Sequence, residues 1–426
     1  MSTLLRLATA GSVDDGKSTL VGRLLYDSKS VLADQLDSVE RVSRDRGLET
    51  ADLALLTDGL RAEREQGITI DVAYRYFATA NRSFILADCP GHVQYTRNTV
   101  TGASTADAIV VLVDVRKGLL EQTSRHLAVA ALLRVPHVIV VVNKIDLVDY
   151  DEAAYDAVVK QVSEAATLLG LPDVHTVPVS ALTGVNVVDL SDLTPWYDGP
   201  SVLELLEELP QADDPVHESF RLPVQFVIRP QGAAGERYLE YRGYAGQVAA
   251  GVVKVGDPVV VLPSGKTTTI AGIDTADGEL TEAFAPQSVT LRLSDDIDIA
   301  RGDLIAAADN PPNVTQDIDG TVAWLSDQPL VPGARVLLKH TTKTVQAVVK
   351  AVGGKLNLAT ADLEPADRLE LNDIGHVTLR LAAPIAAEQY IVGRRTGAFL
   401  LIDGHDGGTL AAGMVGDALL AAKATV

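Results

Sequence analysis

The sequence predicts a doubly wound α/β domain with a mostly parallel sheet, followed by two β-barrel domains. Over residues 1–212, apolar runs of strand length alternate with stretches of helical period, which is typical of a parallel sheet covered by helices. From residue 216 onward, short strands separated by turn residues replace this alternation, which is typical of β-barrels. We therefore expect three domains, at residues 1–212, 216–308 and 313–426.

The elements of the first domain follow from the period of its apolar residues. Continuous apolar runs predict strands that are buried on both faces, at residues 4–10, 84–87, 109–113, 138–142 and 175–179. Helical spacing predicts helices at residues 17–26, 155–169 and 201–209. An acidic, proline-bearing linker at residues 211–215 ends the domain.

The barrels are predicted as two sets of short strands separated by the Asn-Pro-Pro sequence at residues 310–312. The first set spans residues 222–228, 238–244, 246–253, 258–262, 266–273 and 288–293. The second set spans residues 320–325, 334–340, 343–352, 374–381 and 399–403. Residues 264–268 read S-G-K-T-T and look like half a phosphate-binding loop, but Val260 stands where glycine is required. We expect a hairpin turn at this position.

A phosphate-binding loop lies between the first predicted strand and the first predicted helix. Residues 11–18 read G-S-V-D-D-G-K-S, the pattern G-x-x-x-x-G-K-S. Backbone N–H groups of such a loop close on phosphates, its lysine reaches the terminal phosphate oxygens, and its serine hydroxyl ligates Mg²⁺. The pattern predicts a nucleoside triphosphate site with Mg²⁺ at Ser18. Its predicted binding residues are Gly11, Asp14, Asp15, Gly16, Lys17, Ser18 and Thr19.

The base is predicted by a second motif, N-K-I-D at residues 143–146, which ends a buried strand at the carboxyl edge of the sheet. The carboxylate of Asp146 can accept hydrogen bonds from N1–H and the 2-amino group of guanine, and adenine offers neither. Leaving a buried carboxylate unpaired costs about 1–3 kcal/mol, so the site discriminates for guanine. We predict GTP and GDP as ligands. The predicted contacts are Asn143, Lys144 and Asp146, with Ser180, Ala181 and Leu182 as weaker companions under the ring.

Hydrolysis is predicted to involve D-C-P-G-H at residues 88–92, directly after a buried strand. Asp88 is placed to hold the Mg²⁺ shell, Gly91 N–H to face the γ-phosphate, and His92 to lie beside the attacking water. Upstream, Thr69 offers a hydroxyl and a carbonyl to Mg²⁺ and the γ-phosphate. We expect both segments to be ordered by the triphosphate and released by hydrolysis, and the interval 27–70, amphipathic with a helical period, to be partly mobile.

These motifs resemble those of the translation-factor class of GTPases, whose phosphate loop reads G-x-V-D-x-G-K and whose second switch reads D-C-P-G-H. Gln66 replaces the arginine of that class's R-G-I-T-I first switch. The residues in and around these motifs resemble one branch in particular, the GTPase subunit of bacterial sulfate adenylyltransferase. The stretches that carry this resemblance are residues 11–20, 22–30, 63–77, 94–98, 195–197 and 242–246.

The resemblance implies further roles, position by position. Val13 and Ile68 match a pair of apolar side chains that flank the catalytic histidine, which is His92 here. Asp14 matches a phosphate-loop aspartate that in relatives can help to hold a monovalent cation. Cys89 and Val93 depart from the branch's usual Thr and Glu, which affects how the second switch meets its partner rather than any nucleotide contact.

The composition of the chain indicates where in the cell the protein is located. No apolar run approaches the roughly 20 residues needed to span a bilayer. The first predicted strand begins near residue 4, which leaves no room for a targeting peptide, and a single cysteine excludes an internal disulfide. We expect a cytoplasmic protein without a membrane segment.

Charge separates two interpretations of the GTPase. Residues 1–210 carry 18 basic and 30 acidic side chains, and the remainder carries 18 and 27, so neither half is basic as a tRNA carrier would be. No histidine pair or S-G-G-x-D-S loop of the kind used for adenylyl transfer occurs. By resemblance, we expect a regulatory subunit that binds a separate catalytic adenylyltransferase subunit and couples GTP hydrolysis to formation of adenylylsulfate and diphosphate from ATP and sulfate. The alternative is an elongation factor-like GTPase that delivers aminoacyl-tRNA.

Overall fold

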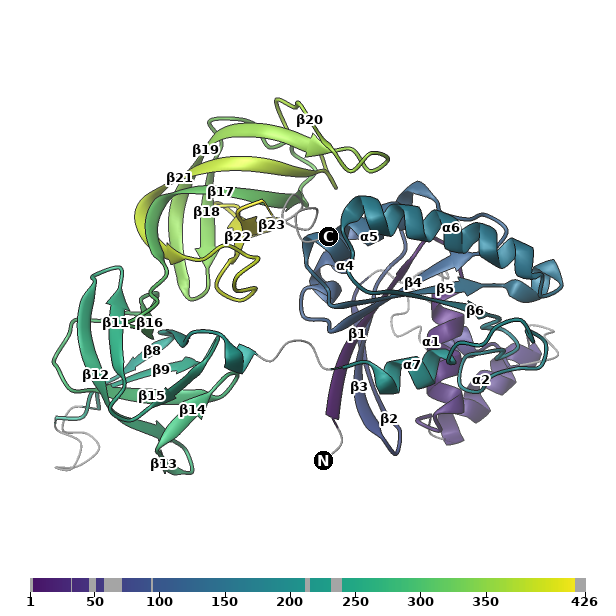
Figure 1. Ribbon diagram of the computed structural model, residues 1–426, viewed down its shortest axis with the longest axis horizontal. Coiled ribbons are helices and arrows are strands. Elements are labelled where there is room, and N and C mark those ends of the chain that lie inside the picture. Colours follow the sequence, from purple (N-terminus) through teal and green to yellow (C-terminus); the bar gives the residue numbers. More distant parts are fainter. Residues whose placement is uncertain are drawn as a thin grey trace. The chain divides into compact units, whose positions relative to one another are not determined.

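The computed structural model describes residues 3–31, 33–45, 51–56, 71–92, 95–210, 215–230 and 240–417. The chain divides into two compact units, unit 1 mainly within Met1–Ala212 and unit 2 mainly within Asp213–Ala421. Unit 1 is an α/β domain and unit 2 holds two barrels of antiparallel strands, so the predicted fold class is confirmed (Figure 1).

Unit 1 is built on one six-stranded sheet with the order β2-β3-β1-β4-β5-β6. All neighbours pair in parallel except β2, which runs antiparallel to β3 at the edge. The strands are β1 (Thr3–Gly11), β2 (Ala73–Ala78), β3 (Arg82–Asp88), β4 (Ala108–Asp114), β5 (His137–Asn143) and β6 (Val174–Val179). The helices are α1 (Lys17–Asp27), α2 (Ala33–Asp45), α4 (Thr96–Ala103), α5 (Glu121–Leu132), α6 (Glu152–Leu169) and α7 (Val202–Glu208), with 3₁₀ turns η1 (Leu53–Leu56) and η3 (Ile145–Val148).

The five strands and three helices predicted for this domain are all present within a few residues. Helix α2 lies in the amphipathic interval 27–70, of which residues 32, 46–50 and 57–70 lie outside the described part of the chain. Strand β2 and helices α4 and α5 are present in the structure but were not predicted from the sequence. Strand β2 alternates between half-buried and exposed positions because it is an edge strand, so it has no continuous apolar run.

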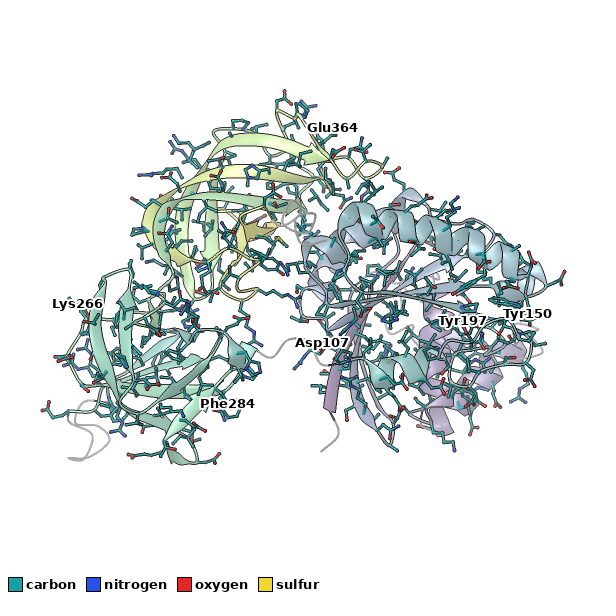
Figure 2. The ribbon with its side chains drawn as sticks, in the orientation of Figure 1. Asp107, Tyr150, Tyr197, Lys266, Phe284 and Glu364 are labelled. Carbon is teal, nitrogen blue, oxygen red and sulfur yellow. The ribbon has the colours of Figure 1, made fainter. Side chains whose placement is uncertain are left out.

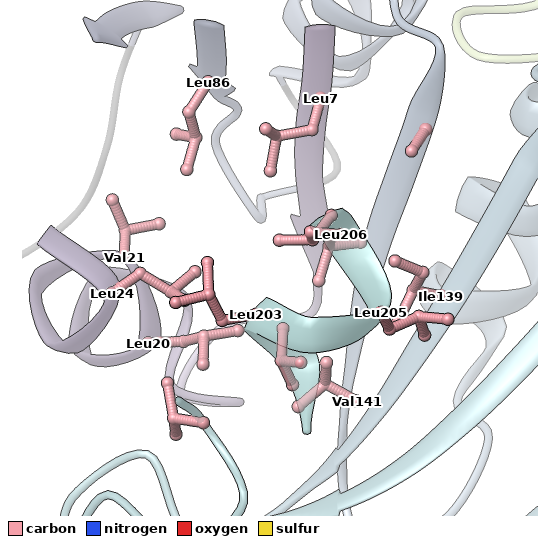
Figure 3. Close-up of a cluster of buried hydrophobic side chains, with 14 of the residues drawn as sticks. Leu7, Leu20, Val21, Leu24, Leu86, Ile139, Val141, Leu203, Leu205 and Leu206 are labelled. Atoms are coloured by element: carbon pink, nitrogen blue, oxygen red, sulfur yellow. The ribbon is translucent and has the colours of Figure 1, made fainter. Parts of the chain in front are cut away.

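The core of unit 1 lies between the sheet and the pair α1 and α7. Leucines of both helices pack on alternate residues of β1, β3 and β5, as Figure 3 shows for Leu24, Leu206 and Leu7. Each such side chain, when fully buried, contributes about 1.5–3 kcal/mol. Helices α4, α5 and α6 cover the other face (Figure 1). This packing fixes the carboxyl ends of the parallel strands, from which the candidate site is built.

The first barrel of unit 2 follows the strand order β7-β16-β11-β12-β15-β9-β8, with β13 paired to β12 and a separate β10-β14 ribbon. Its strands are β7 (Arg221–Pro223), β8 (Phe226–Ile228), β9 (Gly243–Gln247), β10 (Val252–Lys254), β11 (Pro258–Leu262), β12 (Lys266–Thr275), β13 (Gly278–Leu280), β14 (Glu282–Phe284), β15 (Ser288–Leu293) and β16 (Leu304–Ala307). A 3₁₀ turn, η4 (Pro215–His217), precedes them.

Two strand predictions in this barrel were wrong. Residues 222–228 form two strands, because β7 pairs with β16 while β8 pairs with β9, and the chain changes partner between them. The predicted boundary between strands 238–244 and 246–253 falls inside β9, and part of the first strand lies outside the described residues. Gly246 is not a turn residue: its Cα faces Pro223 so closely that a Cβ there would lie 2.4 Å from the Pro223 carbonyl oxygen. A hairpin is found where residues 264–268 predict it, since β11 and β12 pair antiparallel, although the turn itself ends at Gly265 and β12 begins at Lys266.

The second barrel has the order β18-β22-β23-β17-β21-β19-β20, and a further β18–β19 pairing closes the ring. Its strands are β17 (Asn313–Trp324), β18 (Arg335–His340), β19 (Lys343–Leu356), β20 (Leu363–Glu364), β21 (Ile374–Ala387), β22 (Ala398–Ile402) and β23 (Thr409–Val415). The five predicted strands are confirmed, while β20 and β23 were not identified. Among the described helices, none combines the length and apolar character needed to cross a membrane.

A buried ion pair links the two barrels inside unit 2. Arg221, whose side chain is 2% exposed, donates through Nη2 to Glu388 Oε1 at 2.7 Å and to the Asn310 carbonyl at 2.7 Å. Thr396 Oγ1 donates to the other oxygen of Glu388 at 2.5 Å. Both ions are therefore held by several hydrogen bonds, which compensate for the loss of water around them.

We expect Arg221→Ala to lower the free energy of unfolding of unit 2 by about 3–5 kcal/mol, because it leaves the Glu388 carboxylate buried without its cation. Urea unfolding followed by the fluorescence of Trp324, which is buried in the second barrel, measures this effect. Arg380→Ala is the matched control, since the Arg380–Asp317 pair is exposed and such pairs contribute little. Equal stability of the two variants would contradict the assignment of a structural role to the buried pair.

Candidate functional site

The phosphate loop connects β1 to α1, as predicted. Its backbone is left-handed at Asp14 (φ 63°) and at Gly16 (φ 96°), the conformation that glycine tolerates best. Lys17 bends back over the loop and its Nζ donates to the carbonyl oxygens of Gly11 at 2.9 Å and Ser12 at 3.0 Å. Burial lowers the pKa of Lys17, while the carboxylates of Asp88 and Asp15 oppose this shift. The ammonium is thus fixed inside the loop among groups of opposite charge.

The N-terminus of α1 has no capping side chain. Asp151 caps α6 by accepting from Ala154 N–H, and Ser201 caps α7 in a capping box with Glu204, whereas α4 and α5 begin without a side-chain cap. The N-cap residue of α1 is Gly16, which has no side chain, and the first turn of the helix carries no acidic residue. The free N–H groups and the positive end of the helix dipole therefore face the loop, which is the arrangement that binds phosphate. Ser18 and Thr19 lie half-buried in this turn.

The side chain of Asp15 is bonded within the phosphate loop. Its Oδ2 accepts from Ser12 N–H at 2.9 Å, and its Oδ1 lies 3.7 Å from Lys117 Nζ. The side chain is 1% exposed, and burial raises its pKa, opposed by the Ser12 N–H and the neighbouring lysines. The carboxylate thus braces the loop from inside, and only the Asp15 backbone is available to a phosphate.

Asn143, at the end of β5, joins three segments. Its Nδ2 donates to the Asp15 carbonyl at 2.7 Å, and its Oδ1 accepts from Ala181 N–H at 2.9 Å. A Cβ at Gly16 would lie 2.4 Å from Asn143 Nδ2, so the glycine is also needed for this close approach. Asn143 therefore positions the phosphate loop and the residues after β6, and is itself buried at 2% exposure.

Lys144 lies beside the loop in a left-handed conformation, and its ammonium group donates to the Asp14 carbonyl. The same ammonium lies 3.1 Å from Asp114 Oδ2, which also pairs with Arg116 at 2.6 Å. Burial alone would raise the pKa of Asp114, but the hydrogen bonds from Arg116 and Lys144 hold it well below the usual value. Asp114 therefore stays ionised and anchors Lys144 against the loop.

The predicted base-binding residues lie around this anchor. Asp146 is half-buried in η3, and the described residues supply no hydrogen bond to its carboxylate. Ser180 and Ala181 are buried, whereas the Leu182 side chain is 63% exposed. Arg23 of α1 holds this segment through its Nη2, which donates to the Leu182 carbonyl at 2.5 Å. The arrangement leaves Asp146 available to a ligand, as the guanine prediction requires.

The second-switch residues follow β3 and reach Lys17. Asp88 is 1% exposed and accepts from Thr9 Oγ1 at 2.8 Å. Gly91 packs so closely on the phosphate loop that a Cβ there would lie 2.3 Å from Lys17 Nζ. His92 is half-buried, and its ring meets Tyr95 edge-on with centroids 6.2 Å apart. Thr69 and Ile68 lie outside the described residues, and Val13 is 37% exposed.

The oxygen donors suit Mg²⁺. Among the described residues, no group of three or more His, Cys, Asp or Glu side chains is arranged to hold a metal ion by itself. Mg²⁺ is usually held by one or two protein oxygens together with substrate phosphates, and the Ser18 hydroxyl and the Asp88 carboxylate are oxygen donors of this kind.

Four residues of the site were missed by the sequence analysis: Thr9, Asp114, Arg116 and Lys117. The position of Asp114 could have been recognised in the sequence, because it follows the apolar run 109–113 in the same way that Asp88 follows 84–87. Arg116 pairs with Asp114 itself, two residues away. Thr9 and Lys117 act through contacts with distant segments, for which the sequence gives no spacing rule.

We expect Gly91→Ala to weaken nucleotide binding or turnover by roughly tenfold or more, because the added methyl group must displace Lys17 or the backbone of residue 11, as the 2.3 Å and 2.7 Å approaches require. Gly404→Ala is the matched control, since its Cβ would meet nothing within 4 Å. Nucleotide affinity and single-turnover GTP hydrolysis measure the effect. Wild-type values for both variants would show that Gly91 does not pack against the loop as described.

Comparison with known proteins gives the following matches. A family model for the Elongation factor Tu GTP binding domain matches residues 2–211, and one described as GTP-eEF1A C-terminal domain-like matches residues 317–416. The bifunctional enzyme CysN/CysC of Mycobacterium tuberculosis is 54% identical over 417 residues, covering 97% of this chain and 67% of that protein. Sulfate adenylyltransferase subunit 1 of Teredinibacter turnerae is 48% identical over 424 residues, covering 99% of this chain and 89% of that protein. A solved structure of Sup35 complexed with GDP covers 98% of this chain and 94% of that chain, with 25% identity and a TM-score of 0.43.

Proposed function

This chain belongs to the sulfate adenylyltransferase subunit 1 family, and from that premise we propose that it hydrolyses GTP to drive the formation of adenylylsulfate and diphosphate from ATP and sulfate by a separate catalytic subunit. The GTPase part of the proposal is supported by the phosphate loop. Lys17 donates to the carbonyl oxygen of Gly11 within this loop, and Asn143 links Asp15 of the loop to Ala181. The described residues make no hydrogen bond to the Asp146 carboxylate, which is therefore available to a base. We propose that the protein acts in the cytoplasm, where its substrates GTP and ATP are found.

The residues of the loop would bind and orient the triphosphate. N–H groups at the start of α1 would receive the phosphates, and the Lys17 ammonium would exchange its carbonyl partners for phosphate oxygens. When bound, Mg²⁺ supplies positive charge that stabilises the charge developing on the phosphoryl oxygens. Ser18 and Asp88 would hold it, and Thr69 is proposed as a further ligand. The proposal includes a monovalent cation at Asp14, held by the carboxylate because Lys144 already contacts the carbonyl.

His92 would orient the attacking water. It directly follows Gly91, which lies against Lys17, so His92 is one residue from the segment that meets the γ-phosphate. Val13, exposed on the phosphate loop, and Ile68 are proposed as the apolar pair that flanks it. This arrangement would position water and shield it, which is how phosphoryl-transfer sites act in general.

Coupling to adenylyl transfer requires that the catalytic subunit sense the nucleotide. If the partner accelerates hydrolysis by favouring the closed arrangement of the second switch, then GTP must strengthen partner binding by the same free energy. Cys89 is buried in this switch, with its Sγ 3.6 Å from the Ala87 carbonyl oxygen. We therefore expect the departure at Cys89 to act on the packing of the switch.

The test uses the catalytic subunit copurified from the native host and identified by mass spectrometry. We expect its affinity for this chain to be several-fold higher with a non-hydrolysable GTP analogue than with GDP, measured by analytical ultracentrifugation or biolayer interferometry. Pyrophosphate release by the complex should rise when GTP is added, and the chain alone should release none. Tight GTP-dependent binding of aminoacyl-tRNA, with no effect of GTP on pyrophosphate release, would favour the elongation-factor alternative instead.

A further inference from the structure

A cavity of about 300 Å³ lies in unit 1 among residues that the nucleotide site does not use. Its walls come from the first turns of α6, from β6, and from the segment 196–200 that precedes α7. Figure 2 shows Tyr197, which lines the cavity, and Tyr150, whose carbonyl contacts its wall, on the same side of the unit.

Three aromatic rings form one wall of the cavity. Tyr155 and Trp196 have centroids 5.2 Å apart, and Tyr197 lies 6.3 Å from Tyr155 and 6.5 Å from Trp196. Their polar atoms are all used: Trp196 Nε1 donates to the Tyr150 carbonyl at 3.0 Å, and the hydroxyls of Tyr155 and Tyr197 donate to the carbonyls of Thr176 and Pro200 at 3.1 Å and 2.9 Å. The rings are thereby locked, and those of Trp196 and Tyr197 remain half-exposed.

Carboxylates surround these rings. Glu152, Asp156 and Asp198 line the cavity and are exposed, and no Lys or Arg is among the described residues that line it. Glu152 is explained by its place in the first turn of α6, where a negative charge favours the helix. Asp156 lies one turn further and Asp198 belongs to another segment, so the helix explains neither.

The carboxylates around the cavity act on its tyrosines. The pKa of Tyr197 is raised mainly by burial, and the neighbouring Tyr155 and the carboxylates of Asp198 and Glu204 raise it further. The pKa of Tyr155 is also raised mainly by burial, with a smaller contribution from Asp156, and a hydrogen bond with Thr176 opposes the shift. The exposed carboxylates that line the cavity favour a bound cation, and the faces of Trp and Tyr rings attract cations as well.

We propose that this cavity binds the guanidinium group of an arginine side chain presented by a protein partner. Guanidinium is planar and weakly hydrated, stacks on aromatic faces and pairs with carboxylates, whereas an ammonium ion is strongly hydrated and compact. A protein-borne cation fits because the cavity opens among exposed carboxylates on a chain of net charge −21, which favours a basic partner surface.

The two tryptophans of the chain allow a direct test by NMR on the full-length protein labelled with ¹⁵N at its indoles. Trp196 lines the cavity, while Trp324 is buried in a barrel and serves as an internal reference. The probe is the blocked tripeptide acetyl-Gly-Arg-Gly-amide, and the matched neutral probe replaces arginine by citrulline. We expect saturable movement of the Trp196 indole signal alone, at roughly millimolar peptide, and binding of the citrulline peptide weaker by about fivefold or more.

Variants separate the site from general attraction by an acidic protein. Asp156→Asn combined with Asp198→Asn should weaken the arginine peptide by about fivefold or more. Glu164→Gln is the matched control, because Glu164 is an exposed acid on the same helix that does not line the cavity. Both proteins should keep wild-type GTP turnover, since none of these residues belongs to the nucleotide site.

Three results would overturn the proposal: equal binding of the arginine and citrulline peptides, equal weakening by Glu164→Gln and by the double variant, or no saturable movement of the Trp196 signal. Guanidinium and tetramethylammonium ions are tested in parallel. If these free cations move the Trp196 signal and the arginine peptide does not, the cavity is a small-molecule cation site and the proposed occupant is wrong.

Discussion

Replacing His92 by alanine is expected to lower GTP turnover by roughly 10²-fold while GTP and GDP affinities stay close to wild type. The reason is that His92 follows Gly91, which packs against Lys17, so its ring can reach the region of the γ-phosphate without contributing to the loop itself. Groups that orient or deprotonate a reacting water contribute about 10²–10⁴ in rate. Single-turnover hydrolysis and equilibrium binding of a fluorescent GDP analogue measure the two quantities separately.

Two further variants serve as controls for this prediction. His405→Ala removes an exposed histidine of unit 2 and should change neither quantity. Lys17→Ala should impair binding itself, because Lys17 donates to the loop carbonyls and is proposed to exchange these for phosphate oxygens. If His92→Ala and Lys17→Ala lose affinity to the same extent, His92 supports the structure and does not act on the water.

The second large effect is expected from Asp146→Asn. This variant should prefer xanthine nucleotides, whereas the wild type should prefer guanine nucleotides. An amide presents one acceptor and one donor where the carboxylate presents two acceptors, so the 2-amino group of guanine meets a donor and the 2-oxo group of xanthine meets a partner. Sites that hydrogen-bond a substrate group reject an analogue lacking it by up to 10⁴–10⁵, so a shift of about 10² or more in relative affinity is expected.

The neighbouring Asp149 provides the control for this substitution. It is exposed, three residues further along, and Asp149→Asn should leave both affinities unchanged. Competition between GTP and xanthosine triphosphate, measured by displacement of a fluorescent GDP analogue, compares the variants directly. Unchanged preference in Asp146→Asn would remove Asp146 from the base site and leave the guanine assignment without its main support.

The parts of the site that could be predicted are those encoded over short stretches. The phosphate loop, the N-K-I-D sequence and the D-C-P-G-H sequence each follow a buried strand, so their positions at the carboxyl edge of the sheet follow from the order of strands. What the individual side chains do there depends on contacts between distant segments. The sequence predicts Asn143 as a nucleotide contact, whereas its hydrogen bonds to Asp15 and Ala181 join distant segments and are encoded by no local pattern.

The barrels show the same limit for backbone structure. Strands such as β11 and β15 were located correctly, because each is a single stretch rich in apolar or β-branched residues and has one partner strand on each side. The change of partner between β7 and β8 could not be predicted, since residues 222–228 form one apolar pattern across the break. Strand β13 has only three residues and pairs with the end of β12, so its apolar signal is too short to recognise.

The coupling of GTP hydrolysis to adenylyl transfer is tested most directly by the rate of GTP hydrolysis by the chain with its catalytic subunit under four conditions: no substrate, ATP alone, sulfate alone, and both together. We expect slow turnover in the first three conditions and a rise of about tenfold or more only when both substrates are present, because only the complete reaction favours the closed second switch. GTP turnover that is the same in all four conditions would contradict the coupling.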